Sequence, residues 1–178
     1  LHSGKKALVG FIPIGSGNDI PGAVGIKPDA VRAVEVIAQG NVGNHDVGWA
    51  KTESIDKNRY FLGIGSQGFD AAVTKVTNES EKKHSGTWNY VVNVLKLVSS
   101  FKKRKVKVIM DDDVFEGTCN LVAVGNGPSY GGGMYICPDA LTNDEIFHVT
   151  IIQMGKLELL YNFKSMYSRT LQPHKGAL

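Results

Sequence analysis

Two short glycine-rich segments hold the residues whose types and spacing can do chemistry. The first, Gly15 to Asp19, reads GSGND and follows an apolar run, Ala7 to Ile14, that predicts a strand. A loop at the carboxyl end of a parallel strand presents backbone N–H groups that attract phosphate. Ser16 adds a hydroxyl donor, and Asn18 and Asp19 can hold the loop through bonds to the backbone. The same residue types also make ordinary turns, so both interpretations stay open.

The second segment begins at Gly125 and reads GNGPSYGGGMYICPDALTNDE. An apolar run, Leu121 to Val124, predicts a buried strand that leads into it, and Pro128 excludes a continuing ladder. Three consecutive glycines from position 131 permit positive φ and let a ligand or another backbone approach closely. A plain hairpin would not need them, although a glycine-rich turn without a ligand remains the alternative.

The elements around these segments change character along the chain. Asp29 opens a predicted helix whose apolar residues recur at helical spacing until Gly40 ends it. From Val42 onward the sequence is rich in strand-like runs. These runs are VGWAK, RYFLGIGS, KVKVIMD, VFEGTCNLVAVG and IFHVTIIQM. We interpret residues 56–58 as a turn between two strands, and residues 111–113, all aspartate, as a solvated hairpin turn rather than a metal site.

One predicted helix, Thr87 to Phe101, interrupts the strands and is followed directly by Lys102, Lys103, Arg104 and Lys105. Cations at the C-terminal end of a core-packed helix are favoured by its dipole. The alternative is a membrane-facing element, in which the basic cluster meets anionic headgroups. Asp70, in QGFDAAV, likewise has two interpretations, as a cap for a helix starting at Ala71 or as a residue on the substrate side of a cleft.

Composition limits the function classes. The chain has 178 residues, is 42% hydrophobic and carries a formal net charge of +3, which suits a globular protein and gives no electrostatic argument for nucleic acid. Its two cysteines are too few for a disulfide framework, and its five histidines lack metal-ligand spacing. No apolar run approaches the roughly 20 residues that span a bilayer, so we expect a cytoplasmic protein, with peripheral membrane contact as the alternative.

Taken in order, the motifs resemble the diacylglycerol kinase and sphingosine kinase superfamily, in particular its bacterial soluble lipid kinases. The resemblance covers most of the chain. It rests on GSGND, VGIKPDAVRAVEVIAQG, HDVGWA, FLGIGSQGFDAAV, VGNGPSYGGGM and PDALTNDEI. It implies an α/β plus all-β fold, with the end of an α/β nucleotide-binding domain at residues 1–42 and a β-sandwich-like lipid-kinase domain, incomplete at its C-terminus, at residues 43–178.

The resemblance also implies roles for individual residues. Nucleotide would contact Gly15, Ser16, Gly17, Asn18 and Asp19. The cleft would be shaped by Asp70, Asn126, Gly127, Gly131, Gly132 and Gly133. A structural Mg²⁺, or Ca²⁺, would bind the Asp144 carboxylate between Leu141 and Ile146, where the family usually has glycine in place of Glu145.

The implied activity is transfer of the γ-phosphoryl group of ATP to a lipid hydroxyl. The family's upstream glycine-rich phosphate loop and its terminal acidic segment have no counterpart here, so the resemblance implies an internal fragment that is itself inactive. Two alternatives stay open, a non-catalytic lipid- or nucleotide-binding module and a soluble-metabolite kinase of the NAD kinase and phosphofructokinase superfamily. The sequence specifies neither the lipid, nor the general base, nor the oligomeric state.

Overall fold

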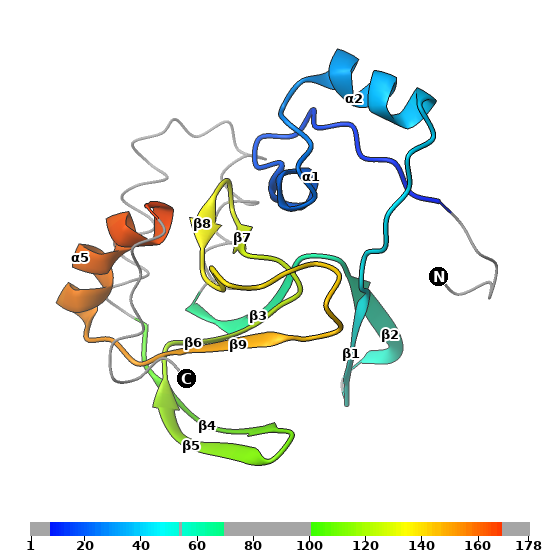
Figure 1. Ribbon diagram of the computed structural model, residues 1–178. Coiled ribbons are helices and arrows are strands. Elements are labelled where there is room, and N and C mark those ends of the chain that lie inside the picture. The colour runs from blue at the N-terminus through cyan, green and yellow to red at the C-terminus, as the bar shows by residue number, and fades with distance from the viewer. Residues whose placement is uncertain (1–7, 54, 70–100, 169–178) are drawn as a thin grey trace.

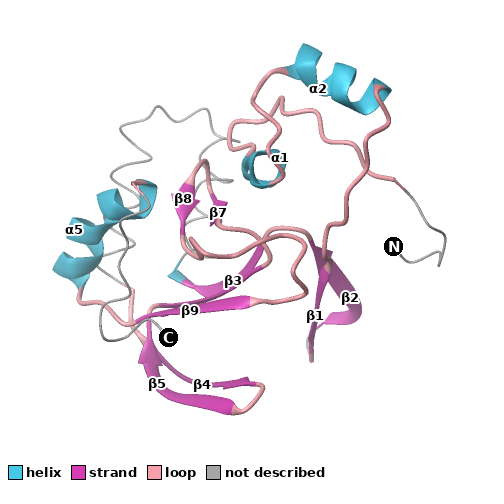
Figure 2. Ribbon diagram, viewed as in Figure 1, coloured by secondary structure: helices cyan, strands magenta, loops and turns pink. Residues whose placement is uncertain are grey.

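The computed structural model describes residues 8–53, 55–69 and 101–168 (Figure 1). The predicted helix from Thr87 and the predicted site residue Asp70 lie outside the described residues. Helices and loops of the N-terminal part lie above a group of small antiparallel sheets (Figure 2).

The described residues of the N-terminal part form two helices, α1 (Asp19–Ala23) and α2 (Ala30–Ala38). The α2 prediction is confirmed, because the Asp29 side chain accepts a hydrogen bond from the Arg32 N–H and Gly40 adopts φ 68° just beyond the helix end. By contrast, residues 8–14 form no strand, so that prediction is wrong. Among the described residues no strand pairs with this segment to complete its backbone hydrogen bonds.

Helix α2 keeps its apolar stripe turned to solvent. Val31, Val34 and Ile37 are 72%, 52% and 45% exposed, and only Ala33 of the helix is buried. The Ile37 side chain packs close to Gly10, so a side chain at position 10 would require the Ile37 side chain to shift. The N-terminal part is therefore held to the rest of the described structure mainly through α1 and the loops beside it (Figure 1).

Nine strands follow in the described residues, and all of their pairings are antiparallel. They are β1 (Gly48–Thr52), β2 (Ile55–Phe61), β3 (Ile64–Gly68), β4 (Arg104–Met110), β5 (Asp113–Cys119), β6 (Leu121–Gly125), β7 (Ser129–Tyr130), β8 (Met134–Tyr135) and β9 (His148–Ile152). In the described part they form a three-stranded sheet in the order β3-β6-β9 and three hairpins, β1-β2, β4-β5 and β7-β8.

The three-stranded sheet carries the core. Strand β6 is central, with Leu121 opposite Gly68 on β3 and opposite Ile152 on β9. Alternate β6 residues, Leu121 and Ala123, are buried because successive side chains on a strand point to opposite faces. The buried cluster comprises Phe69, Leu121, Ala123, Ile136, Cys137, Ala140, Ile152, Met154, Leu159 and Met166.

Several strand predictions need correction. Residues 56–58, predicted as a turn, lie inside β2. The run from Val114 to Gly125 is two strands that break at buried Asn120, whose N–H donates to the Ile152 carbonyl and whose Oδ1 accepts from the Met154 N–H. The solvated turn at residues 111–113 is confirmed, because exposed aspartates connect β4 to β5 and Asp111 adopts φ 44°.

A third described helix, α5 (Lys156–Tyr167), is absent from the sequence-based expectations. Its first turn is closed by the Glu158 carboxylate, which accepts from the Gly155 N–H at 3.1 Å. Leu159 and Met166 bury its inner face against the core cluster. A glutamate three residues after the cap was the available signal for this helix.

Candidate functional site

A cavity of about 470 Å³ lies where the two glycine-rich segments meet. One wall is the beginning of α1, the second is the β7-β8 hairpin, and the third is the loop after residue 138. The lining residues are Gly17, Asn18, Asp19, Gly22, Ala23, Pro128, Ser129, Gly132, Gly133, Tyr135, Pro138, Ala140, Leu141, Thr142 and Asn143. The fold thus brings together segments more than 100 positions apart in the sequence.

The carboxylate of Asp19 joins two of these walls. Its Oδ1 accepts from the Ser129 hydroxyl at 2.8 Å and from the Gly133 N–H at 2.8 Å. Its Oδ2 accepts from the Gly132 N–H at 2.8 Å. These are charge-assisted hydrogen bonds, which are shorter and stronger than neutral ones. The expectation that Asp19 bonds to backbone is correct, but the backbone belongs to the other glycine segment.

Asn18 closes the first glycine loop. Its Oδ1 accepts from the Gly15 N–H at 3.0 Å and its Nδ2 donates to the Gly15 carbonyl at 2.7 Å. Asn18 adopts a left-handed conformation, φ 54°, which asparagine tolerates better than most residues. Ser16, at the outer end of this loop, is exposed and does not line the cavity.

The three consecutive glycines form the turn of the β7-β8 hairpin. Gly131, Gly132 and Gly133 adopt φ 65°, 85° and 95°, conformations that an L residue adopts at a cost. A Cβ on Gly17 would lie 3.4 Å from the Gly132 nitrogen and 3.0 Å from Asp19 Oδ2. The backbone that approaches Gly131 to Gly133 closely is therefore that of the first glycine loop, together with the Asp19 carboxylate.

Asn126 does not line the cavity. Its side chain is fully buried, and its Nδ2 donates to the carbonyls of Asp46 at 2.7 Å and Leu62 at 3.0 Å. Its own N–H donates to the Gly63 carbonyl. Asn126 therefore ties the start of the second glycine segment to the β2-β3 connection and to the chain that enters β1, while neighbouring Gly127 is buried beside Thr142 and Ala23.

Asp46 forms a second connection across the site. Its N–H donates to the Thr142 carbonyl at 2.7 Å, and its Oδ2 accepts from the Glu145 N–H at 2.7 Å. Two polar groups of Asp46, the N–H and the carboxylate, thus hold the third wall of the cavity, while its carbonyl accepts from Asn126 at the start of the second glycine segment. Sequence reasoning missed Asp46, Ser129 and Thr142, and their residue types alone did not single them out.

The predicted metal residues share one turn. Asp144 Oδ1 accepts from the Ile146 N–H at 3.1 Å, which makes a short side-chain turn. Leu141 and Ile146 are exposed, and Glu145 adopts φ 62°, the left-handed region in which glycine is favoured. The described residues contain no group of three His, Cys, Asp or Glu side chains suited to a metal ion, so an ion here would need backbone carbonyl ligands.

Behind the cavity, the Cys137 thiol lies against the sheet. Both cysteines of the chain are free and buried. Burial raises the pKa of the Cys137 thiol, whose Sγ lies 3.4 Å from the His148 carbonyl and 3.5 Å from Thr150 Oγ1. A Cβ on Gly125 would lie 2.7 Å from that sulfur, so the thiol fills the space that a side chain at position 125 would occupy.

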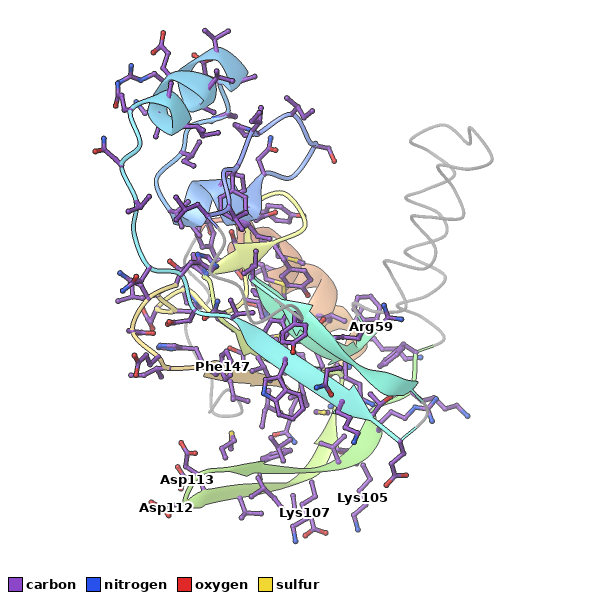
Figure 3. The ribbon with its side chains drawn as sticks, turned by 90° about the vertical axis from the view of Figure 1, so that its right-hand side faces the viewer. Arg59, Lys105, Lys107, Asp112, Asp113 and Phe147 are labelled. Carbon is purple, nitrogen blue, oxygen red and sulfur yellow. The ribbon has the colours of Figure 1, made fainter. Side chains whose placement is uncertain are left out.

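The predicted basic cluster is exposed but is not confined to a helix end. Lys102 and Lys103 lie in a loop, whereas Arg104 and Lys105 are the first residues of β4. Figure 3 shows Lys105 and Lys107 projecting from one side of the β4-β5 hairpin, with Asp112 and Asp113 at its tip. Among the described residues, no helix is long and apolar enough to cross a bilayer.

Two protein-family models match this chain and identify the family to which it belongs. Residues 63–172, more than half of the chain, match the model described as YegS C-terminal NAD kinase beta sandwich-like domain. Residues 1–50 match the diacylglycerol kinase catalytic domain. The chain belongs to the diacylglycerol kinase and lipid kinase superfamily. This membership confirms the resemblance and the α/β plus β-sandwich fold class.

Individual relatives agree with this assignment. A Klebsiella pneumoniae protein named "Probable lipid kinase YegS-like" is 27% identical over 85% of this chain and 49% of its own length. A Cronobacter sakazakii protein of the same name is 24% identical over 97% of this chain and 54% of its own. The chain therefore spans about half the length of these relatives.

A solved structure shows the same fold. It is named "A putative diacylglycerol kinase from Bacillus anthracis str. Sterne" and aligns with a TM-score of 0.64 at 21% identity, over 94% of this chain and 54% of that one. The site residues and the domain boundary inferred from the resemblance stay predictions.

The left-handed Glu145 generates a stability prediction. Glu145→Gly should raise the free energy of unfolding by about 0.5–1 kcal/mol, because left-handed backbone costs an L residue roughly 1–2 kcal/mol and the greater chain entropy of glycine offsets part of that gain. Urea denaturation measures the change. Glu145→Ala is the matched control, because it removes the same side chain but keeps the strain. Equal stabilisation by both variants would show that the backbone at Glu145 is unstrained.

Proposed function

We propose that this chain is part of an ATP-dependent lipid kinase that transfers the γ-phosphoryl group to a lipid hydroxyl. The observation that supports this most directly is the Asp19 bridge, which makes both glycine segments walls of one cavity. Lipid kinase is also the activity named for the Klebsiella and Cronobacter relatives. Because the chain spans about half of their length, the activity is proposed for the protein at its full natural length.

In this reaction the lipid oxygen bonds to the γ-phosphorus as the bond from that phosphorus to the β,γ-bridging oxygen breaks, and the hydroxyl proton passes to an acidic side chain. Catalysis of this kind is chiefly positioning and charge stabilisation. The described residues supply positioning, since Asn18 closes the first glycine loop and Asp19 fixes it against the second. ATP supplies the phosphoryl group.

The loop of Ser16 and Gly17 fits a nucleotide phosphate, because Ser16 is exposed and no hydrogen bond among the described residues uses its hydroxyl. The N–H groups of Gly132 and Gly133 are committed to Asp19 and do not serve this purpose. We therefore assign nucleotide contact to the first loop, and the hairpin to the substrate side of the cavity.

Ser16→Ala should weaken ATP binding two- to tenfold, because a hydrogen bond from a neutral hydroxyl contributes about 0.5–1.5 kcal/mol. Calorimetric titration and transfer of ³²P from ATP to diacylglycerol in mixed micelles, both on the full-length protein, measure the effect. Unchanged ATP affinity and unchanged turnover would show that Ser16 does not contact the nucleotide. Transfer to soluble alcohols but not to lipid would favour the metabolite kinase, and ATP or lipid binding without any transfer would favour the binding module.

We also propose that the turn at Asp144 holds Mg²⁺, with Ca²⁺ as a substitute. Its donors would be the second carboxylate oxygen of Asp144 and the carbonyls of Leu141 and Ile146, hard oxygen ligands of the type these ions prefer. Such an ion would stiffen the third wall of the cavity, to which Leu141 and Thr142 belong.

Asp144→Asn keeps the size of the side chain but removes the charge that favours a divalent ion. Millimolar Mg²⁺ should raise the melting temperature of the parent chain and not that of the variant, because only a native state that binds the ion is stabilised by it. Asp139→Asn, on an exposed residue of the same loop, is the control. Identical shifts for all three proteins would leave the turn without a metal.

A lipid substrate requires contact with a membrane surface, and we propose the outer face of the β4-β5 hairpin for it. This outer face consists of Lys105, Lys107, Ile109, Val114, Glu116 and Thr118, all exposed. Ile109 and Val114 are directly opposed, and Lys105 lies 3.9 Å from Glu116, leaving Lys107 and the neighbouring Lys102, Lys103 and Arg104 in excess of that one acid. The aspartates lie apart, at the tip (Figure 3).

Replacing Lys105 and Lys107 together with glutamine should weaken binding to phosphatidylglycerol vesicles by up to ~1 kcal/mol per charge, and raised salt should reduce the difference. Vesicle sedimentation measures it. The control removes the same charge elsewhere, at exposed Lys27 and Lys156. Equal binding of the two double variants would exclude the hairpin as the contact surface.

A further inference from the structure

Ser129 is a cavity residue to which neither the sequence nor the family comparison gives a role. It is partly buried on β7, and its hydroxyl donates to Asp19 Oδ1 at 2.8 Å. Among the described residues, three donors hold this carboxylate, and Ser129 supplies the side-chain donor, the other two being the backbone N–H groups of Gly132 and Gly133.

The arrangement of the donors gives Ser129 a distinct task. Oδ1 receives two of the bonds, from Ser129 and Gly133, whereas Oδ2 receives one, from Gly132. Without the hydroxyl each oxygen keeps a single amide bond from a loop of three glycines, the most flexible backbone available. The carboxylate and the hairpin turn could then move together, and the first glycine loop, which touches this turn at Gly17, would lose a fixed neighbour.

We propose that Ser129 is a positioning residue for phosphoryl transfer, acting through Asp19. Its hydroxyl fixes the orientation of the Asp19 carboxylate and thereby the spacing between the nucleotide loop and the substrate-side hairpin. This inference rests on the proposed function. Small displacements of groups that align reactants reduce turnover more than they reduce binding.

The kinetic test compares Ser129→Ala with Ser129→Thr in the full-length protein. The alanine variant should lose about tenfold in kcat while KM for ATP changes less than about twofold, because the hydroxyl bonds to Asp19 and not to Ser16 or Gly17, the residues assigned to the phosphate. Threonine restores a hydroxyl and should recover at least half of kcat. Ser165→Ala is the matched control, because it also removes one intramolecular hydroxyl bond, to the Asn162 carbonyl on α5, away from the cavity.

A second readout reports on the carboxylate directly in the 178-residue chain. Amide hydrogen exchange at Gly132 and Gly133, resolved by NMR, should be several-fold faster in Ser129→Ala and faster still, by about tenfold or more, in Asp19→Ala, which removes the acceptor of both amides. Ser129→Thr and Ser165→Ala should exchange as the parent does. A merely structural role for Ser129 would lower the melting temperature without this local pattern.

The experimental outcomes distinguish a failure of the Ser129 role from a failure of the proposed lipid kinase activity. If Asp19→Asn abolishes transfer while Ser129→Ala keeps parental kcat and parental exchange, Ser129 has no positioning role although the kinase stands. If the parent transfers no phosphoryl group to any lipid, the proposed function fails, and the role of Ser129 in the reaction fails with it even where the exchange pattern is as expected. A higher KM for ATP with unchanged kcat in Ser129→Ala would also contradict the positioning role, because it would indicate that Ser129 contacts the nucleotide.

Discussion

One carboxylate, that of Asp19, determines how the two glycine-rich parts of this chain meet. Helix α1, which begins at Asp19, has only five residues and includes Pro21 and Gly22, so it has little intrinsic stability. Its place is instead set by charge-assisted bonds to the β7-β8 turn. The glycines on both sides serve this contact, since a side chain at position 17 would crowd both the carboxylate and the turn.

A second carboxylate, that of Asp46, fixes the loop that forms the third wall of the cavity. It holds the turn at Glu145 through a backbone N–H, while Asn126 binds the carbonyl of the same aspartate. The cavity is therefore fixed from two directions by short acidic side chains bound to main chain. Two buried polar atoms beside this junction, Asn126 Oδ1 and His45 Nδ1, have no hydrogen-bond partner among the described residues. Such atoms are commonly satisfied by an ordered water.

The sequence predicted local features well and connections between segments poorly. The Asp29 cap and Gly40 stop of α2 follow from residue type and spacing, as does the acidic turn between β4 and β5. Motif order also identified the family and the fold class. Residues 8–14 were misassigned because an apolar run shows only that burial is favourable, whereas a strand also needs a partner.

In the candidate site, too, local features were predicted and contacts between distant segments were not. The sequence named Asp19 and Gly131 to Gly133, but it could not show that the carboxylate of one segment occupies the amides of the other, because that contact spans more than 110 positions. Ser129, Asp46 and Thr142 belong to residue types common in every loop. Their importance comes from tertiary contacts, which no local pattern encodes.

The contact between Gly125 and Cys137 has a consequence for how this sequence can diverge. The thiol occupies the volume next to position 125, on the central strand beneath the cavity. A methyl group at position 125 would lie 2.7 Å from both the Cβ and the sulfur of Cys137, so it fits only if position 137 becomes glycine or the backbone shifts, since cores accept exchanges that conserve volume far better than net additions. The two positions are therefore expected to change as a pair, with the larger residue on one side at a time.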